Sequence, residues 1–160
     1  MDMKLAYTTT LAHPSKASYL QAVRMIERLN PLFIDMIKNE LTDNGVDGLT
    51  GVQALLIFNI GNAEFTAGDL IGRKLYLGSN VTYNLNKLVE GGYIDRNQSD
   101  ADKRCVRIKL TDKGKNVAKM VEGMLTQQAS WLGTAGIDAD HLDIFNRVSA
   151  KIEHLWNWQA

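Results

Sequence analysis

Apolar residues recur every three or four positions over residues 20–41, a spacing that places them on one face of a helix. Ser15 or Ser18 is suited to cap the start of this helix, and Gly45 to the left-handed position beyond its end. Pro31 lies inside the run, where it removes one backbone hydrogen bond. The pattern therefore predicts a long first helix that is kinked or divided in two at the proline.

Shorter helices are predicted next. Residues 50–53 (Thr-Gly-Val-Gln) have the form of a capping box, and the nearly continuous apolar run after them predicts a helix that is buried on most sides and ends at 61–62. A second box at 66–69 (Thr-Ala-Gly-Asp) predicts a short helix. Ser79 is suited to cap a further helix over 79–90, which two glycines end.

After these glycines the pattern changes to the twofold alternation of a β-strand. Residues 93–96 and 105–110 alternate apolar and polar side chains, and the stretch between them, 97–104, is polar apart from one alanine. This arrangement predicts an antiparallel hairpin with a charged tip.

Two more helices complete the chain. Thr111 is suited to cap a long helix that is interrupted at 133–136, and a final helix is predicted from Asp138. The final helix carries a narrow apolar stripe at a spacing of three or four: Leu142, Phe145, Val148, Ile152 and Leu155. A helix–turn–helix followed by a hairpin is a winged helix, so we expect a mainly α fold with a small β-hairpin wing.

The chain has 160 residues, a length that suits a single domain. It has no apolar run of about 18 residues, and its first residues lack the basic and apolar segments of a secretory signal. Its single cysteine, Cys105, excludes an intrachain disulfide and suits a reducing compartment. We therefore expect a cytoplasmic protein without a membrane partner.

Net charge is zero, but the charges are unevenly distributed. Residues 66–115 hold ten basic and six acidic side chains, a net charge of +4, whereas residues 1–65 and 116–160 each carry −2. A positive middle between acidic ends is typical of a polyanion-binding segment. This segment contains the helix 79–90 and the hairpin.

The helix 79–90 has one apolar face, formed by Val81, Leu85, Leu88 and Val89. An ordinary solvated face would be built mainly from Glu, Lys and Gln, but this helix is rich in Asn, Ser, Thr and Tyr. Such side chains suit hydrogen bonding to base edges and phosphates in a major groove, where Asn pairs with adenine and Thr contacts thymine. The candidate DNA-binding residues on this helix are Ser79, Asn80, Thr82, Tyr83, Asn86 and Lys87, with Asn84 on its flank.

The hairpin tip supplies a second candidate contact through Asp102, Lys103 and Arg104. An arginine on a narrow projecting loop suits the electronegative minor groove, and Asp102 is placed to orient the guanidinium of Arg104 by an ion pair. The alternative is a polar turn whose two acids and two bases cancel.

Several stretches resemble the MarR (multiple antibiotic resistance regulator) family of winged helix-turn-helix transcription factors. The Asp-x-Arg at 102–104, followed by Leu-Thr-x-x-Gly at 110–114, is similar to the family's wing signature. Residues 88–94 resemble the end of its recognition helix, and 29–33 resemble part of its first helix. The resemblance extends over residues 18–157.

The resemblance implies a homodimeric repressor or activator that binds an inverted repeat in double-stranded DNA. It implies a recognition helix (79–90) in the major groove, a wing (97–104) in the minor groove with Arg104 held by Asp102, and base or phosphate contacts from the helix. Family members often have Arg where this chain has Tyr83, so its site preference is expected to differ.

The resemblance also implies the organisation of the chain as one domain, 1–160. A DNA-binding lobe would occupy about 50–111, and dimerisation helices about 15–45 and 112–158. It further implies modulation by a small aromatic or phenolic effector bound near the dimer helices. Aromatic residues there would line a pocket or form plain core and interface: Tyr19, Phe33, Trp131, Trp156 and Trp158.

Other functions have weaker support. No catalytic motif is present, so we do not expect an enzyme, and His13, His141 and His154 lack metal-ligand spacing, so we expect no metal or cofactor. Cys105 follows Arg104 on the wing and is a candidate for oxidation sensing, although a free cysteine is more often inert. Two alternatives to a sequence-specific regulator stay open: a protein-interaction module and a sequence-independent architectural DNA binder.

Overall fold

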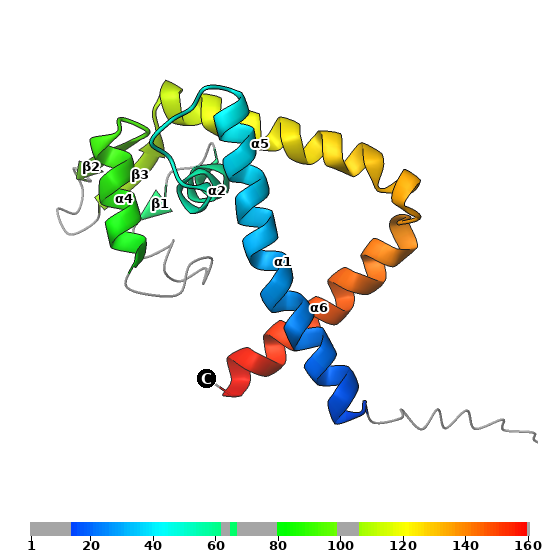
Figure 1. Ribbon diagram of the computed structural model, residues 1–160. Helices are drawn as coiled ribbons and strands as arrows, with labels where there is room; N and C mark the ends of the chain where they lie inside the picture. The colour runs from blue at the N-terminus through cyan, green and yellow to red at the C-terminus, as the bar shows by residue number, and fades with distance from the viewer. Residues whose placement is uncertain (1–13, 62–64, 67–79, 99–105, 160) are drawn as a thin grey trace, which may run out of the picture.

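The computed structural model describes residues 14–61, 65–66, 80–98 and 106–159. In Figure 1, α2, α4 and the strands form a lobe, α5 leads away from it, and α6 returns to cross α1. The fold is mainly α with a small β-sheet, as predicted. In chain order the elements are α1 (Lys16–Asp43), α2 (Gly51–Ile60), β1 (Phe65–Thr66), α4 (Asn80–Glu90), β2 (Ile94–Gln98), β3 (Val106–Leu110), α5 (Asp112–Trp131), the 3-10 helix η1 (Gly133–Ala135) and α6 (Ala139–Gln159).

Helix α1 is capped by Ser15, whose side chain accepts a hydrogen bond from the amide of Ser18. It ends as predicted, with Gly45 beyond its last turn at φ 69°. The predicted division at Pro31 was wrong, because α1 continues through this residue as one helix of 28 residues. The proline lacks only its own amide donor, so the hydrogen bonds of the neighbouring turns can hold the helix together.

Helix α2 lies at the centre of the lobe, against α1 and α5. The predicted capping box is confirmed, since Thr50 and Gln53 satisfy each other's backbone amides at 3.0 and 3.2 Å. A Cβ added at Gly51 would lie 2.3 Å from the carbonyl oxygen of Ile34, so glycine is what allows α2 to start against α1. The core that these helices share with α4 and the sheet includes Ile37, Leu41, Leu56, Ile57, Leu85, Leu88, Ile94, Ile108 and Val121.

The predicted hairpin is confirmed, with β2 and β3 paired antiparallel from Ile94↔Leu110 to Gln98↔Val106. The sheet also contains β1, which pairs with β3 in the order β1-β3-β2 and which the sequence pattern did not predict. Strand β1 has only two residues, too few to show an alternation of apolar and polar positions. The predicted short helix from the 66–69 box lies outside the described residues.

Helix α5 begins after Thr111, which caps it as predicted by accepting a hydrogen bond from the amide of Gly114 at 3.1 Å. The predicted interruption is confirmed at η1, where Gly136 has a left-handed φ of 75°. Helix α6 then crosses α1, and the indole of Trp156 donates a hydrogen bond to the hydroxyl of Tyr19 at 2.9 Å. Most of the apolar side chains of α6 remain exposed in the single chain.

Candidate nucleic-acid interface

Helix α4 presents one buried face and one polar face. Val81, Leu85 and Leu88 are buried as predicted, but Val89 is 37% exposed, because it lies at the edge of the apolar arc rather than within it. The helix ends at Gly91 and Gly92, whose amides donate to the carbonyls of the last turn. These contacts fix α4 on the lobe with its polar face turned to solvent.

The candidate residues that the structure describes come together on this face. Thr82, Tyr83, Asn86 and Lys87 are all exposed, and the Tyr83 ring is 58% exposed. Asn80 is the first residue of α4, but its side chain is not described. Ser79, Asp102, Lys103 and Arg104, together with Cys105, lie outside the described residues.

The charged groups of α4 interact with one another. The Nζ of Lys87 lies 2.7 Å from Glu90 Oε2 and 6.0 Å from the centre of the Tyr83 ring. The hydrogen bond with Glu90 and its negative charge raise the pKa of Lys87 above its ordinary value. The contact with Glu90 therefore stabilises the charged form of Lys87.

Arg96 on β2 extends this polar face, and sequence reasoning did not single it out. Its Nη1 donates to Asn86 Oδ1 at 2.8 Å, and both side chains are exposed. The contact joins α4 to β2, the first strand of the hairpin. The sequence gives only a weak signal for it, a basic residue at an outward position of the strand.

A second polar contact joins α4 to α2. Gln53, only 7% exposed, donates from Nε2 to Asn84 Oδ1 at 3.3 Å while its Oε1 accepts from the amide of Thr50. The residue that completes the capping box therefore also contacts the flank of α4. The capping-box motif identified Gln53 but gave no sign of this second role.

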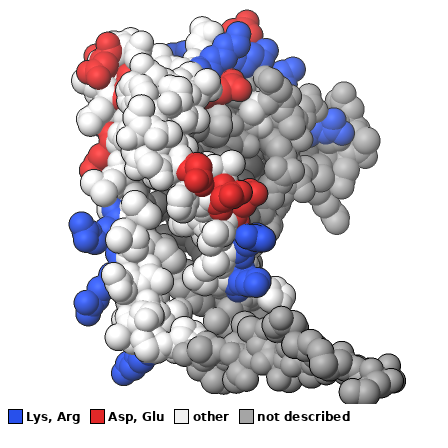
Figure 2. Space-filling model, turned by 90° about the vertical axis from the view of Figure 1, so that its right-hand side faces the viewer, with Lys and Arg blue, Asp and Glu red and all other residues white. Residues whose placement is uncertain are grey.

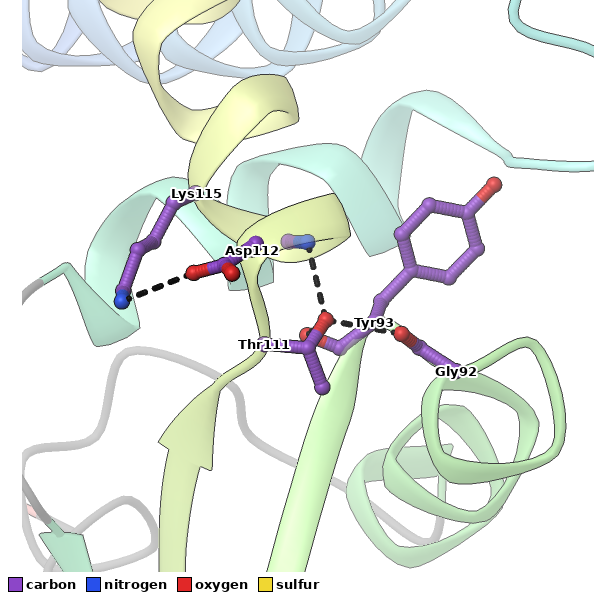
Figure 3. A network of polar contacts seen from close by, with 6 residues as sticks. Gly92, Tyr93, Thr111, Asp112 and Lys115 are labelled. Atoms are coloured by element: carbon purple, nitrogen blue, oxygen red, sulfur yellow. Dashed lines mark hydrogen bonds and ion pairs between the residues drawn. The ribbon is translucent and has the colours of Figure 1, made fainter.

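The end of α4 is locked to the start of α5 in the network of Figure 3. The hydroxyl of Thr111 lies 2.7 Å from the carbonyl oxygen of Gly92, to which it donates, and 3.1 Å from that of Tyr93. The amide of Thr111 also donates to Tyr93, at 3.1 Å. A Cβ added at Gly114 would lie 2.1 Å from the same Tyr93 carbonyl oxygen, so this joint requires glycine.

Lys113 adds two further contacts between the start of α5 and the residues that follow α4. Its Nζ donates to the carbonyl oxygen of Gly91 at 2.8 Å and lies 4.2 Å from the centre of the Tyr93 ring. A cation at this place also complements the negative end of the α4 dipole. The Leu-Thr-x-x-Gly segment thus sets the position of α4 relative to α5.

The aromatic residues predicted near the dimer helices do not form one pocket. Tyr19 and Trp156 meet at the crossing of α1 and α6, whereas Phe33 packs against the core. Trp131 borders a separate cavity of about 380 Å³ between α1 and α5. The rest of its wall consists of Leu32, Asp35, Met36, Asn39, Glu40, Asp43, Met124, Gln127 and Gln128.

The described ranges contain neither a metal-binding cluster nor a membrane-spanning helix. No group of three or more His, Cys, Asp or Glu side chains within them is placed to hold a metal ion. No helix among them is long and apolar enough to cross a membrane.

Comparisons with known proteins agree with this architecture. The family model described as "Winged helix DNA-binding domain" matches residues 49–114. The exopolysaccharide II synthesis transcriptional activator ExpG of Rhizobium meliloti (strain 1021) is 32% identical over 142 residues, which cover 89% of this chain and 73% of ExpG. These matches, with the fold, define the class as a winged-helix DNA-binding protein.

Solved structures share the fold of this chain. A cysteine-to-serine mutant of MarR from E. coli, complexed with operator DNA, matches with a TM-score of 0.68 and 21% identity, over 88% of this chain and 99% of that one. FabT of Streptococcus pneumoniae in complex with DNA matches with a TM-score of 0.64 and 20% identity, over 87% and 99%. The chain belongs to the MarR family of winged helix-turn-helix transcriptional regulators.

Proposed function

We propose that this chain is a homodimeric regulator that binds an inverted repeat, with α4 of each subunit in the major groove and residues 97–104 in the adjacent minor groove. The observation that carries the proposal is the exposed polar face of α4, where Thr82, Tyr83, Asn86 and Lys87 are collected beside Arg96. Related proteins support it, since the E. coli and S. pneumoniae structures are complexes with DNA.

Exposed apolar side chains on α1 and α6 support the homodimer. A single chain leaves Leu142, Phe145 and Val148 between 39% and 58% exposed along one side of α6. On α1, Tyr19, Leu20, Met25, Ile26, Leu29 and Leu32 are exposed as well. The side of the molecule seen in Figure 2 shows scattered charges and broad uncharged areas. A second copy would bury these apolar groups and bring two recognition helices into one assembly.

The sequence assigns DNA contacts to residues whose side chains the structure does not describe, and we keep them in the proposal. Ser79 and Asn80 would act at the start of α4, and Asp102, Lys103 and Arg104 at the hairpin tip. Arg104→Ala is expected to weaken operator binding by about 1–3 kcal/mol, the size of one good base contact. Fluorescence anisotropy would measure it, with Arg147→Ala on α6 as the charge-matched control. Equal losses in both variants would contradict the wing contact.

Selection of bound sequences from a random DNA pool, at two salt concentrations, tests the main proposal. We expect an inverted repeat with half-site centres about one helical turn, roughly 34 Å, apart, and an affinity that falls steeply with salt. Sequence-independent binding with the same salt dependence would favour the architectural alternative. Recovery of no DNA would favour the protein-interaction module.

We further propose that a small ligand modulates binding from the cavity between α1 and α5. Its volume of about 380 Å³ suits a small organic molecule, and Trp131 and Met36 give it aromatic and apolar walls. Because Asp35, Glu40 and Asp43 also border it, a neutral aromatic should bind better than a phenolate. A neutral aromatic alcohol should raise the Tm of the wild type more than the phenolate form of a nitrophenol does, and Trp131→Ala should abolish the rise. No shift with either compound would argue against this cavity.

A further inference from the structure

The side-chain amides of two asparagines on α4, Asn84 and Asn86, have orientations that their partners define. An amide carries a carbonyl oxygen that accepts hydrogen bonds and an NH2 group that donates them, and a half-turn exchanges the two. Which of them a DNA partner meets depends on which of them the protein already holds. The neighbours of Asn86 and Asn84 settle this question from chemistry alone.

The partner of Asn86 is a pure donor. A guanidinium has only N–H groups, so the Asn86 atom that lies 2.8 Å from Arg96 Nη1 must be the carbonyl oxygen. The opposite orientation would set two donors against each other. Arg96 therefore turns the oxygen of Asn86 toward β2 and leaves the NH2 group as the main hydrogen-bonding capacity of this side chain.

The amide of Asn84 is oriented in the same way, with its oxygen toward a donor of the protein, by contacts that do not involve Arg96. The backbone amide of Thr50 is a donor, so the Gln53 atom 3.0 Å from it is Oε1, which leaves Gln53 Nε2 to face Asn84. Because Nε2 donates, its partner at 3.3 Å is Asn84 Oδ1. Both asparagines thus have their oxygens engaged by donors of the protein.

We propose that Arg96 is a positioning residue that fixes the amide of Asn86, so that the recognition helix offers an N–H donor to hydrogen-bond acceptors on DNA. This inference rests on the proposed function of α4. The acceptor is a phosphate oxygen or an acceptor on a base edge, such as N7 or O6 of guanine. It differs from the adenine pairing that asparagine suggests in the sequence, because that pair needs the oxygen of Asn86 for the adenine amino group, and Arg96 competes for it.

A double-mutant cycle on the selected operator tests the coupling. Arg96→Met and Asn86→Ala should each weaken binding about tenfold, and the double variant should also lose only about tenfold, because Arg96 acts through Asn86. A loss of about a hundredfold in the double variant would mean that Arg96 contacts DNA independently and would overturn the proposal. Both side chains are exposed, so folding should persist, which an unchanged Tm would verify.

Lys109→Met supplies the matched control. Lys109 is an exposed cation of the same sheet, paired in register with Asp95 rather than with α4. Its loss should combine additively with Asn86→Ala, as expected for groups that share no partner. Non-additivity of the same size in this control would assign the effect to charge in general and would contradict a specific role of Arg96.

Repeating the selection with Asn86→Ala separates the two kinds of acceptor. A phosphate contact predicts the same selected sequence with uniformly weaker binding, and a base contact predicts a relaxed preference for guanine at one position of each half-site. A relaxed preference for adenine would overturn the proposal, since reading adenine against guanine requires the oxygen. If the wild type itself selected no repeat, the proposed function would fail rather than this inference alone.

Discussion

The ammonium of Lys87 interacts with two side chains of α4, those of Glu90 and Tyr83. Its ammonium is 2.7 Å from the carboxylate of Glu90, and both groups are exposed. Exposed pairs of this kind contribute little to folding stability, because water screens them and their long side chains lose freedom. In the proposed complex with DNA the same pair would have a larger effect, because it places a carboxylate on the face that would meet a polyanion.

Glu90→Gln should therefore strengthen DNA binding. Removing the negative charge releases Lys87 for a phosphate, and we expect a gain of about three- to tenfold at low salt, which shrinks as salt is raised. Anisotropy titrations at two ionic strengths would measure it. Glu153→Gln on α6 makes the same charge change far from α4 in sequence and should leave the affinity within about twofold; an equal gain there would refute a local effect.

At the scale of elements, the joint between α4 and α5 is formed by contacts that particular residues supply. The hydroxyl of Thr111 donates to the carbonyl of Gly92 (Figure 3). Lys113 donates to the carbonyl of Gly91, and Gly114 lets the carbonyl of Tyr93 approach the first turn of α5. Substitutions here are expected to act on stability and on the position of α4 together.

Gly114→Ala should destabilise the protein by about 2 kcal/mol or more, because its Cβ would overlap the Tyr93 carbonyl, which is backbone and cannot turn away. Gly123→Ala is the matched control on the same helix, where a Cβ meets nothing within 4 Å. It should stabilise by about 0.5–1 kcal/mol through helix propensity. Urea denaturation would measure both, and a neutral Gly114→Ala would show that the joint can relax.

The sequence predicted the elements whose ends are set locally. The capping box at Thr50 and the glycine beyond α1 were predicted correctly, because each depends on residues a few positions apart. Contacts between elements were not predictable in the same way. Strand β1 exists only through its pairing with β3, and Arg96 meets Asn86 across ten positions of sequence. The candidate residues on α4 were found from composition, but the groups that orient them were not.

At the scale of the whole molecule, the apolar stripe of α6 is the feature that a single chain leaves incomplete. Phe145 is 58% exposed and Val148 50%, on a helix that begins beyond the 3-10 turn and crosses α1. The proposed homodimer gives this surface a partner.

Phe145→Asp should dissociate the dimer without unfolding the chain, because the side chain is exposed in the monomer and buried only in the proposed interface. Sedimentation should show a monomer, and operator affinity should fall by at least a hundredfold, because half-sites would then be bound singly. Ala150→Asp, on the opposite side of α6, should remain dimeric. A dimeric Phe145→Asp would remove this stripe from the interface.

The contacts of Figure 3 also couple the orientation of α5 to the position of α4. A helix of 20 residues extends about 30 Å, and its first turn is hydrogen-bonded to the residues that follow α4. A tilt of about 5° around its far end at Trp131 would displace α4 by about 2–3 Å if the bonded parts moved as one body. In the proposed homodimer, the two α5 helices would set the spacing between the two copies of α4, so a small change in the angle between subunits would alter which DNA phasing fits.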